Sequence, residues 1–250
     1  MSAIIQNIYL KSYIMLHFRQ KAYLFKFKLS FSLLCLFLLG LCITLGVWQL
    51  HRYNYKKTLL TIYQKRVTET PKEFKEILAA KDLQFQSVKV QGRYLASLTF
   101  LIQNRFYHDQ PGFEVLTPLE IPGDEKLLLV DRGWIKEPDD ARLSVTKKLE
   151  VKGHIKLLNE YQFILGDNIL QPEKTPHVAQ RIDMREFSQV THRVFYPFIL
   201  RLNANEMNGF VREWTIVTVP PARHMVYAVQ WFLLGLVLLI AYGCFCCEEV

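Results

Sequence analysis

Two long apolar segments without a single charge stand on either side of a polar stretch of the chain. Leu29–Leu50 spans 22 residues and Met225–Cys247 spans 23. A helix needs about 20 such residues to cross the hydrocarbon core of a bilayer, so both segments predict transmembrane helices. The stretch between them, about 170 residues long, is long enough for one folded domain.

Short runs of strand-like sequence divided by turn residues fill this middle stretch. The predicted strands are Gln86–Leu95, Leu98–Phe106, Phe113–Glu120, Lys126–Lys136, Leu149–Leu158, Phe195–Asn203 and Arg212–Val219. The predicted turns are Gln110-Pro-Gly, Ile121-Pro-Gly-Asp and Glu137-Pro-Asp-Asp, where proline presets φ and glycine or aspartate accepts unusual backbone angles. Helical periodicity predicts a helix over Pro71–Asp82 and a short one over Arg181–Gln189.

The expected fold is therefore a membrane protein with two transmembrane α-helices flanking a mainly antiparallel β (α+β) extramembrane domain, barrel- or sandwich-like. The expected boundaries are a basic tail over 1–28, helices over 29–50 and 224–244, a β-rich domain over 51–223 and a short tail over 245–250. No small-x-small cleavage site follows the first segment, which indicates an uncleaved anchor.

The net charge of +8 is unevenly distributed. The tail before the first span contributes five basic residues and no acid, which suits a position beside anionic lipid. No basic stripe with interleaved aromatic residues is present, so nucleic acid is not an expected partner. Basic residues also follow the first span closely, so charge alone does not say on which side of the membrane the domain lies.

All five cysteines lie in or beside the spans, so the middle domain needs no disulfide framework. Cys244, Cys246 and Cys247 match no zinc or iron–sulfur ligand spacing, and they are interpreted as free thiols of an apolar helix.

The start of the second span holds the most distinctive candidate residues. On a helix, a face made of one histidine, two aromatic and two small residues would comprise His224, Tyr227, Ala228, Trp231 and Gly235. Such a face could bind a flat ligand, with the histidine as its metal ligand. The aromatic residues could equally form the belt found at membrane boundaries.

The end of the first span offers a second set at the same boundary. Trp48, Arg52 and Tyr55 share a helical face. If the spans are neighbours, Arg52 and Arg223 lie at similar depth and, beside the histidine, could hold the propionates of a haem whose ring lies on the aromatic face. Ordinary snorkelling of Arg52 is the alternative.

The middle domain offers no catalytic constellation in its sequence. Asp131-Arg132-Gly133-Trp134 follows an apolar strand, and structural ion pairing is the better interpretation of its charges. His108-Asp109 is a pair of adjacent residues without further support. No G-x-S-x-G, H-E-x-x-H, P-loop or dinucleotide motif occurs, so an enzyme is not expected.

Four segments together resemble the surfeit locus protein one family of cytochrome c oxidase assembly factors. They are Leu45–Arg52 (LGVWQLHR), Gly112–Leu119 (GFEVLTPL), Leu129–Ile135 (LVDRGWI) and His224–Phe232 (HMVYAVQWF). The resemblance covers the whole length and both spans. The chain departs from it at Asp131, where the family usually has asparagine, and at Met225, where it usually has leucine.

The resemblance implies an assembly factor that assists delivery of haem a to the largest oxidase subunit, subunit I, with haem a synthesis proteins as further partners. The haem contact would be His224, with Arg223, Arg52, Tyr227, Trp231 and Trp48 around the cofactor. The implied location is the bacterial inner membrane with the domain in the periplasm, or the mitochondrial inner membrane. The alternatives are a scaffold that holds oxidase subunits without haem and, less favoured, an enzyme acting on a membrane substrate.

Overall fold

The computed structural model describes residues 13–18, 21–26, 28–137, 149–158, 170 and 175–249. Within it the chain forms two compact units. The helical unit consists of Met1–Leu60 with Val217–Val250, and the barrel unit consists of Thr61–Ile216. The expected fold class, two apolar helices flanking a strand-rich domain, is confirmed.

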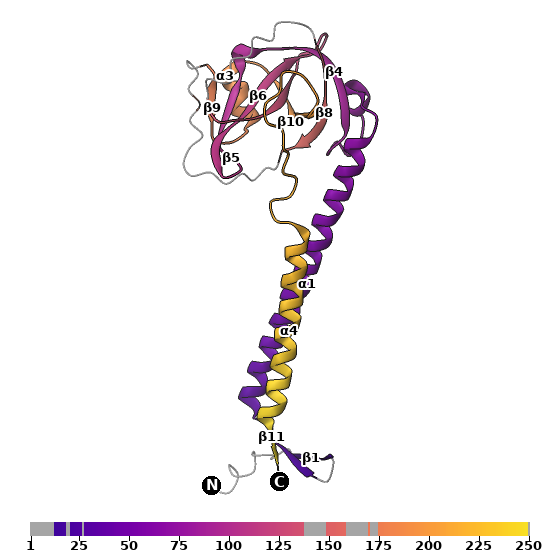
Figure 1. The fold of residues 1–250 in the computed structure, drawn as a ribbon, viewed down its shortest axis with the longest axis vertical. Coiled ribbons are helices and arrows are strands. Elements are labelled where there is room, and N and C mark those ends of the chain that lie inside the picture. The colour runs from indigo at the N-terminus through magenta and orange to yellow at the C-terminus, as the bar shows by residue number, and fades with distance from the viewer. Residues whose placement is uncertain are drawn as a thin grey trace, which may run out of the picture. The chain divides into compact units, whose positions relative to one another are not determined.

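The helical unit is built from α4 (Pro221–Cys246) and from α1 (Leu29–Thr68) as far as Leu60. Both helices are long and apolar enough to cross a membrane. The ends of the two helices meet in a small antiparallel sheet (Figure 1). Its strands are β1 (Tyr13–Phe18), β2 (Lys21–Lys26) and β11 (Cys247–Glu249), with β2 in the centre.

The first helix continues beyond the apolar span. The sequence predicts a transmembrane segment over 29–50, but α1 extends to Thr68. Residues 51–68 contain no glycine or proline, so nothing interrupts the hydrogen-bond ladder until Pro71 approaches. The expected domain boundaries at 51 and 223 thus fall inside α1 and α4.

Five strands of the second unit close into a barrel. They are β4 (Ser87–Tyr94), β6 (Gln110–Glu120), β7 (Leu127–Ile135), β8 (Leu149–Leu157) and β10 (Phe195–Leu202). Their order is β4-β8-β10-β7-β6, and β6 pairs again with β4. All neighbours are antiparallel except β7 and β10, which are parallel. The closing contact is reinforced by an ion pair of 2.8 Å between Arg93 and Glu120.

Smaller elements extend this barrel. They are β3 (Lys72–Glu73), α2 (Phe74–Ile77), the 3₁₀ turn η2 (Ala96–Leu98), β5 (Phe100–Tyr107), β9 (His177–Ala179) and α3 (Met184–Thr191). The strand β5 pairs with β6, and β9 adds to β5 in parallel. The side chain of Asp183 accepts the N–H groups of Arg185 and Glu186 and so caps α3. The rings of Phe100 and Phe187 stack with centroids 3.9 Å apart, which fixes α3 on the sheet.

Most predicted elements form within three residues of their expected bounds, and three predictions are wrong. The helix expected over Pro71–Asp82 shrinks to α2, because Lys72–Glu73 pairs with β4 instead. Arg212–Val219 is no strand, and only Val211 bridges to Trp134. The turn expected at Gln110-Pro-Gly lies at His108–Asp109, since β6 already begins at Gln110. The turn expected at Glu137-Pro-Asp-Asp extends into residues outside the described ones.

Candidate functional site

The helices α1 and α4 pack as an antiparallel pair along one face of each. The more buried positions of α1 recur in steps of three and four: Ser32, Cys35, Leu39, Cys42, Gly46, Gln49 and Tyr53. On α4 they are Pro221, His224, Ala228, Trp231, Gly235, Leu238 and Tyr242. An average step of 3.5 residues is the repeat of a coiled-coil seam.

Small residues let the two helices approach closely. A Cβ atom added at Gly46 would lie 2.6 Å from Cε1 of Phe232, and one at Gly235 would lie 3.4 Å from Cδ1 of Leu39. Close approach of this kind replaces the hydrophobic effect as the source of helix association inside lipid. Toward the chain ends, the hydroxyls of Ser32 and Tyr242 share a hydrogen bond of 2.6 Å.

At the other end of this seam, His224 contacts Gln49. The Nδ1 atom of His224 lies 2.8 Å from Oε1 of Gln49. If the amide oxygen accepts, Nδ1 must carry the hydrogen, and Nε2 then holds the free lone pair. Nε2 is buried and has no hydrogen-bond partner among the described residues.

This arrangement suits a metal ligand. Histidines that bind metals usually donate their other ring N–H to a carbonyl or carboxylate, which fixes the tautomer and the orientation of the ring. Gln49 can play that part for His224. An unpaired buried nitrogen also costs free energy, which coordination of an iron atom would offset. His224 therefore has the features of a histidine that could hold a haem iron through Nε2.

The face predicted for α4 separates into two parts. Ala228 and Gly235 are buried on the seam, and His224 and Trp231 are half-buried there. Tyr227 lies off the seam with 48% of its surface exposed. Trp231 thus lies on the same seam as His224, two helical turns further along α4, whereas Tyr227 lies off it.

The arginines and Trp48 lie outside the seam. Trp48, Arg52 and Arg223 are exposed, and the guanidinium of Arg52 lies 5.9 Å from the centre of the Tyr55 ring. The contact between Gln49 and His224 fixes the register of the pair and puts Arg52 within about one helical turn of the level of Arg223. The sequence-based expectation of similar depth agrees with this register, while their role toward a cofactor stays a prediction.

Gln49 is the residue that sequence reasoning missed. The sequence does point to Gln49, because a polar amide in an apolar segment of 22 residues is a functional candidate by default. Gln230, the amide in the second apolar segment, lies on the exposed side of α4.

The charged motif of β7 does not form an internal ion pair. Asp131 faces Arg201 on β10, with Oδ2 of the aspartate 3.5 Å from Nε of the arginine. Arg132 donates through Nε to the carbonyl of Asn208 at 2.7 Å and lies between the rings of Tyr94 and Phe210. Both side chains are buried. Asp131 has an ion-pair partner as expected, whereas Arg132 has no carboxylate within 4.0 Å in the described parts of the chain and is held by its hydrogen bond and the two rings.

The remaining candidate residues form no catalytic or metal-binding cluster in the described parts of the chain. His108 and Asp109 are exposed turn residues with positive φ. Cys35 and Cys246 are buried, and the described residues contain no group of three or more His, Cys, Asp or Glu side chains that could hold a metal ion.

Comparison with known proteins finds one family along most of the chain. A family model described as the SURF1 family matches residues 36–236. A SURF1-like protein of Rickettsia felis is 24% identical over 220 residues, which cover 84% of this chain and 94% of that protein. A SURF1-like protein of Dictyostelium discoideum is 26% identical over 46% of this chain and 45% of its own length. The cytochrome oxidase assembly protein SHY1 of Saccharomyces cerevisiae is 26% identical over 40% of this chain and 27% of its own.

Proposed function

The chain belongs to the SURF1 family, and we propose from this premise that it assists the assembly of cytochrome oxidase by holding haem a at His224 on its way to subunit I. Support for the assembly role comes from the yeast relative, whose name states that role. Support for the haem step comes from one observation, the buried and unpaired Nε2 of His224 beside Gln49.

The helix pair suits a haem that carries a long apolar tail. Such a molecule is poorly soluble in water, and the exposed residues of the apolar spans, 29–50 of α1 and 225–245 of α4, are mostly hydrophobic. Arg52 and Arg223, at nearly the same level of the pair, supply cations for two propionates. A single histidine ligand keeps the complex weak enough to release its cargo, as delivery to the oxidase and its haem a synthesis partners requires.

The proposed topology places both flanking segments on the cytoplasmic side of a bacterial inner membrane and the barrel unit in the periplasm. The strand β11 pairs with β2, so the segments before α1 and after α4 lie on the same side of any membrane that the helices cross. A mitochondrial inner membrane with the same arrangement is the alternative location.

The proposal predicts that full-length protein, purified in detergent after co-expression with haem a synthesis enzymes, shows a Soret band. His224→Ala should remove this band, because it deletes the iron ligand. His51→Ala is the matched control, since His51 is an exposed histidine of α1 near the same boundary, and it should leave the band unchanged. Absorption spectra of the three proteins decide the matter. A haem-free wild type would leave the scaffold as the function.

Gln49→Leu should weaken haem binding by about tenfold or more while leaving the protein folded. Loss of the amide oxygen frees the imidazole ring to rotate and to change tautomer, and removal of such supporting partners typically costs 10–100-fold in metal affinity. The measurement is a haem titration followed at the Soret band. Gln230→Leu removes an exposed amide of α4 and serves as the control, with wild-type affinity expected. Equal affinities of the two variants would show that Gln49 does not position the histidine.

A further inference from the structure

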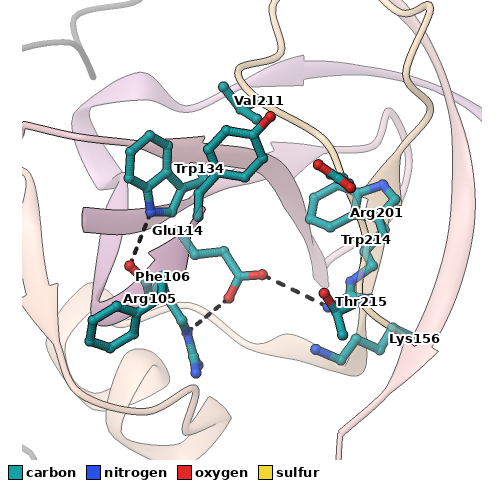
Figure 2. A pocket seen from close by; sticks show the side chains of 11 residues that line it. Arg105, Phe106, Glu114, Trp134, Lys156, Arg201, Val211, Trp214 and Thr215 are labelled. Carbon is teal, nitrogen blue, oxygen red and sulfur yellow. Dashed lines mark hydrogen bonds and ion pairs between the residues drawn. The ribbon is translucent and has the colours of Figure 1, made fainter. Parts of the chain in front are cut away.

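The barrel unit contains a second polar cavity that the proposed haem site does not use. It has a volume of about 220 Å³ and opens between β5, β6, β7, β8, β10 and the segment that follows β10 (Figure 2). Three cationic side chains from three strands reach it: Arg105, Lys156 and Arg201. Two indole rings, of Trp134 and Trp214, complete its walls.

The three cationic side chains differ in their carboxylate partners. Nε of Arg105 lies 3.1 Å from Oε2 of Glu114, and Nε of Arg201 lies 3.5 Å from Oδ2 of Asp131. Lys156 has no carboxylate within 4.0 Å of Nζ in the described parts of the chain. Figure 2 shows its side chain extending into the space between Glu114 and Thr215.

Arg201 is held in place by its surroundings. Its side chain is only 9% exposed, and its guanidinium lies 4.7 Å from the centre of the Trp214 ring. The Trp214 ring is itself fixed by a hydrogen bond of 3.1 Å from its N–H to the carbonyl of Leu202. Nε of Arg201 still lacks a hydrogen-bond partner among the described residues. That Nε atom faces Oδ2 of Asp131 at 3.5 Å, and Nη2 lies 3.9 Å from Oε1 of Glu114. Arg201 is thus a rigid cation with two carboxyl neighbours beside an open cavity.

The buried charges do not balance. Burial, followed by the nearby Glu114, raises the pKa of Asp131 well above its usual range. Burial also raises the pKa of Glu114, but Lys156, a hydrogen bond from Asp131 and Arg105 outweigh this, so its pKa lies below the ordinary value. Three basic side chains, Arg105, Lys156 and Arg201, thus face the two carboxyl groups, and burial, followed by the charge of Arg201, lowers the pKa of Lys156. Glu213 stands at the rim with its side chain 70% exposed, beside His108.

We propose that this cavity binds the carboxylate of a small organic anion, with Lys156 and Arg201 as the groups that hold it. Arginine matches a carboxylate through two parallel N–H bonds, and Lys156 supplies a mobile point charge. The indole walls suit an apolar or aromatic body attached to the carboxylate. The indole walls offer no matching surface to inorganic phosphate, so an organic carboxylate with an apolar body should bind more tightly.

This proposal stands apart from the haem site. Its residues all belong to the barrel unit, and none of them is a candidate haem contact. Either site can therefore be disproved while the other remains.

The test uses the full-length protein in detergent and 3-phenylpropionate as the probe. Binding is followed through the indole N–H resonances of Trp134 and Trp214. The wild type should show saturable shifts, and Lys156→Gln should weaken binding by about tenfold through loss of a charge-assisted contact. Lys152→Gln is the matched control, because this lysine lies on the same strand but is paired with Glu150 outside the cavity. It should bind as the wild type does.

A second variant and two further ligands complete the test. Lys156→Arg keeps the charge and should retain binding. If binding is lost in Lys156→Gln and retained in Lys156→Arg, a charge contact is supported even when the neutral variant is less stable. The neutral 3-phenylpropanol should not bind. The proposal is overturned if the probe does not bind the wild type, if the alcohol binds equally well, or if inorganic phosphate binds more tightly than the carboxylate.

Discussion

Gly133→Ala should destabilise the barrel unit by about 3 kcal/mol, because two costs coincide at this position. Gly133 has a φ of +113°, which residues with a side chain rarely adopt. A Cβ atom there would also collide with the carbonyl oxygen of Val211. That oxygen accepts the N–H of Trp134 at 2.8 Å, so the methyl group would push away the segment that bridges to β7.

The measurement is urea unfolding of the full-length protein in detergent, followed by the fluorescence of the barrel tryptophans. Gly123→Ala is the matched control. Gly123 also has a positive φ, of +77°, but nothing lies within 4 Å of the position that its Cβ would take. It should cost only about 1 kcal/mol, the backbone penalty alone. Equal losses in the two variants would show that the contact with Val211 does not hold this segment.

His154→Phe should remove a large part of the acid sensitivity of the barrel unit. His154 is buried between aromatic rings, with the centroid of Tyr63 at 5.2 Å. Burial, and then the positive charge of Arg201, lowers the pKa of His154 to about 3. The unfolded chain has the ordinary value near 6.5.

The direction of the pH effect on stability follows from the number of protons that the folded and unfolded chains bind. Between pH 6.5 and pH 3 the unfolded chain takes up a proton at this histidine and the folded chain does not, so stability falls as pH falls. The full stability is present above pH 6.5, and the loss is about 1.4 kcal/mol per pH unit below it, or about 2–3 kcal/mol at pH 4.5.

The free energy of unfolding at pH 7.5 and pH 4.5, compared between wild type and His154→Phe, measures this loss. Other acidic groups contribute to both proteins, so the difference between the two proteins isolates the histidine. His108→Asn changes an exposed histidine in a turn, where asparagine accepts the positive φ, and should keep the wild-type pH dependence. A variant with an unchanged loss at pH 4.5 would mean that His154 is already charged in the folded protein.

Much of the architecture can be read from local sequence. The segment Lys126–Lys136 stands between two predicted turns and is mostly apolar apart from its Asp131-Arg132 pair and its end residues, and the structure reproduces it closely as β7. The closure of the barrel cannot be read in this way. It depends on Arg93 and Tyr94 of β4 pairing with Glu120 and Leu119 of β6, and nothing local in either strand specifies its partner.

For the two candidate sites as well, single residues can be read from the sequence, but the contacts between distant residues cannot. The sequence points to His224 because a histidine at the start of an apolar span stands out, but its contact with Gln49 joins two helices 175 residues apart. The cations of the barrel cavity come from β5, β8 and β10, so no motif unites Arg105, Lys156 and Arg201. Arg212–Val219 fails as a strand for a related reason. The side chain of Arg212 donates to the carbonyls of Asn203 and Glu206, which holds this segment as a loop.

The position of β10 has a consequence for how the protein is made. This strand lies between β7 and β8, so both of those strands remain open edges until residues 195–202 have left the ribosome. Open edges invite pairing with other chains. Arg201, the ion-pair partner of Asp131 on β7, also lies on β10 and is therefore synthesised late. Barrel closure and the burial of Asp131 beside Arg201 are therefore one late event in synthesis, and a chain stopped before Phe195 would leave β7 and β8 as unpaired edges.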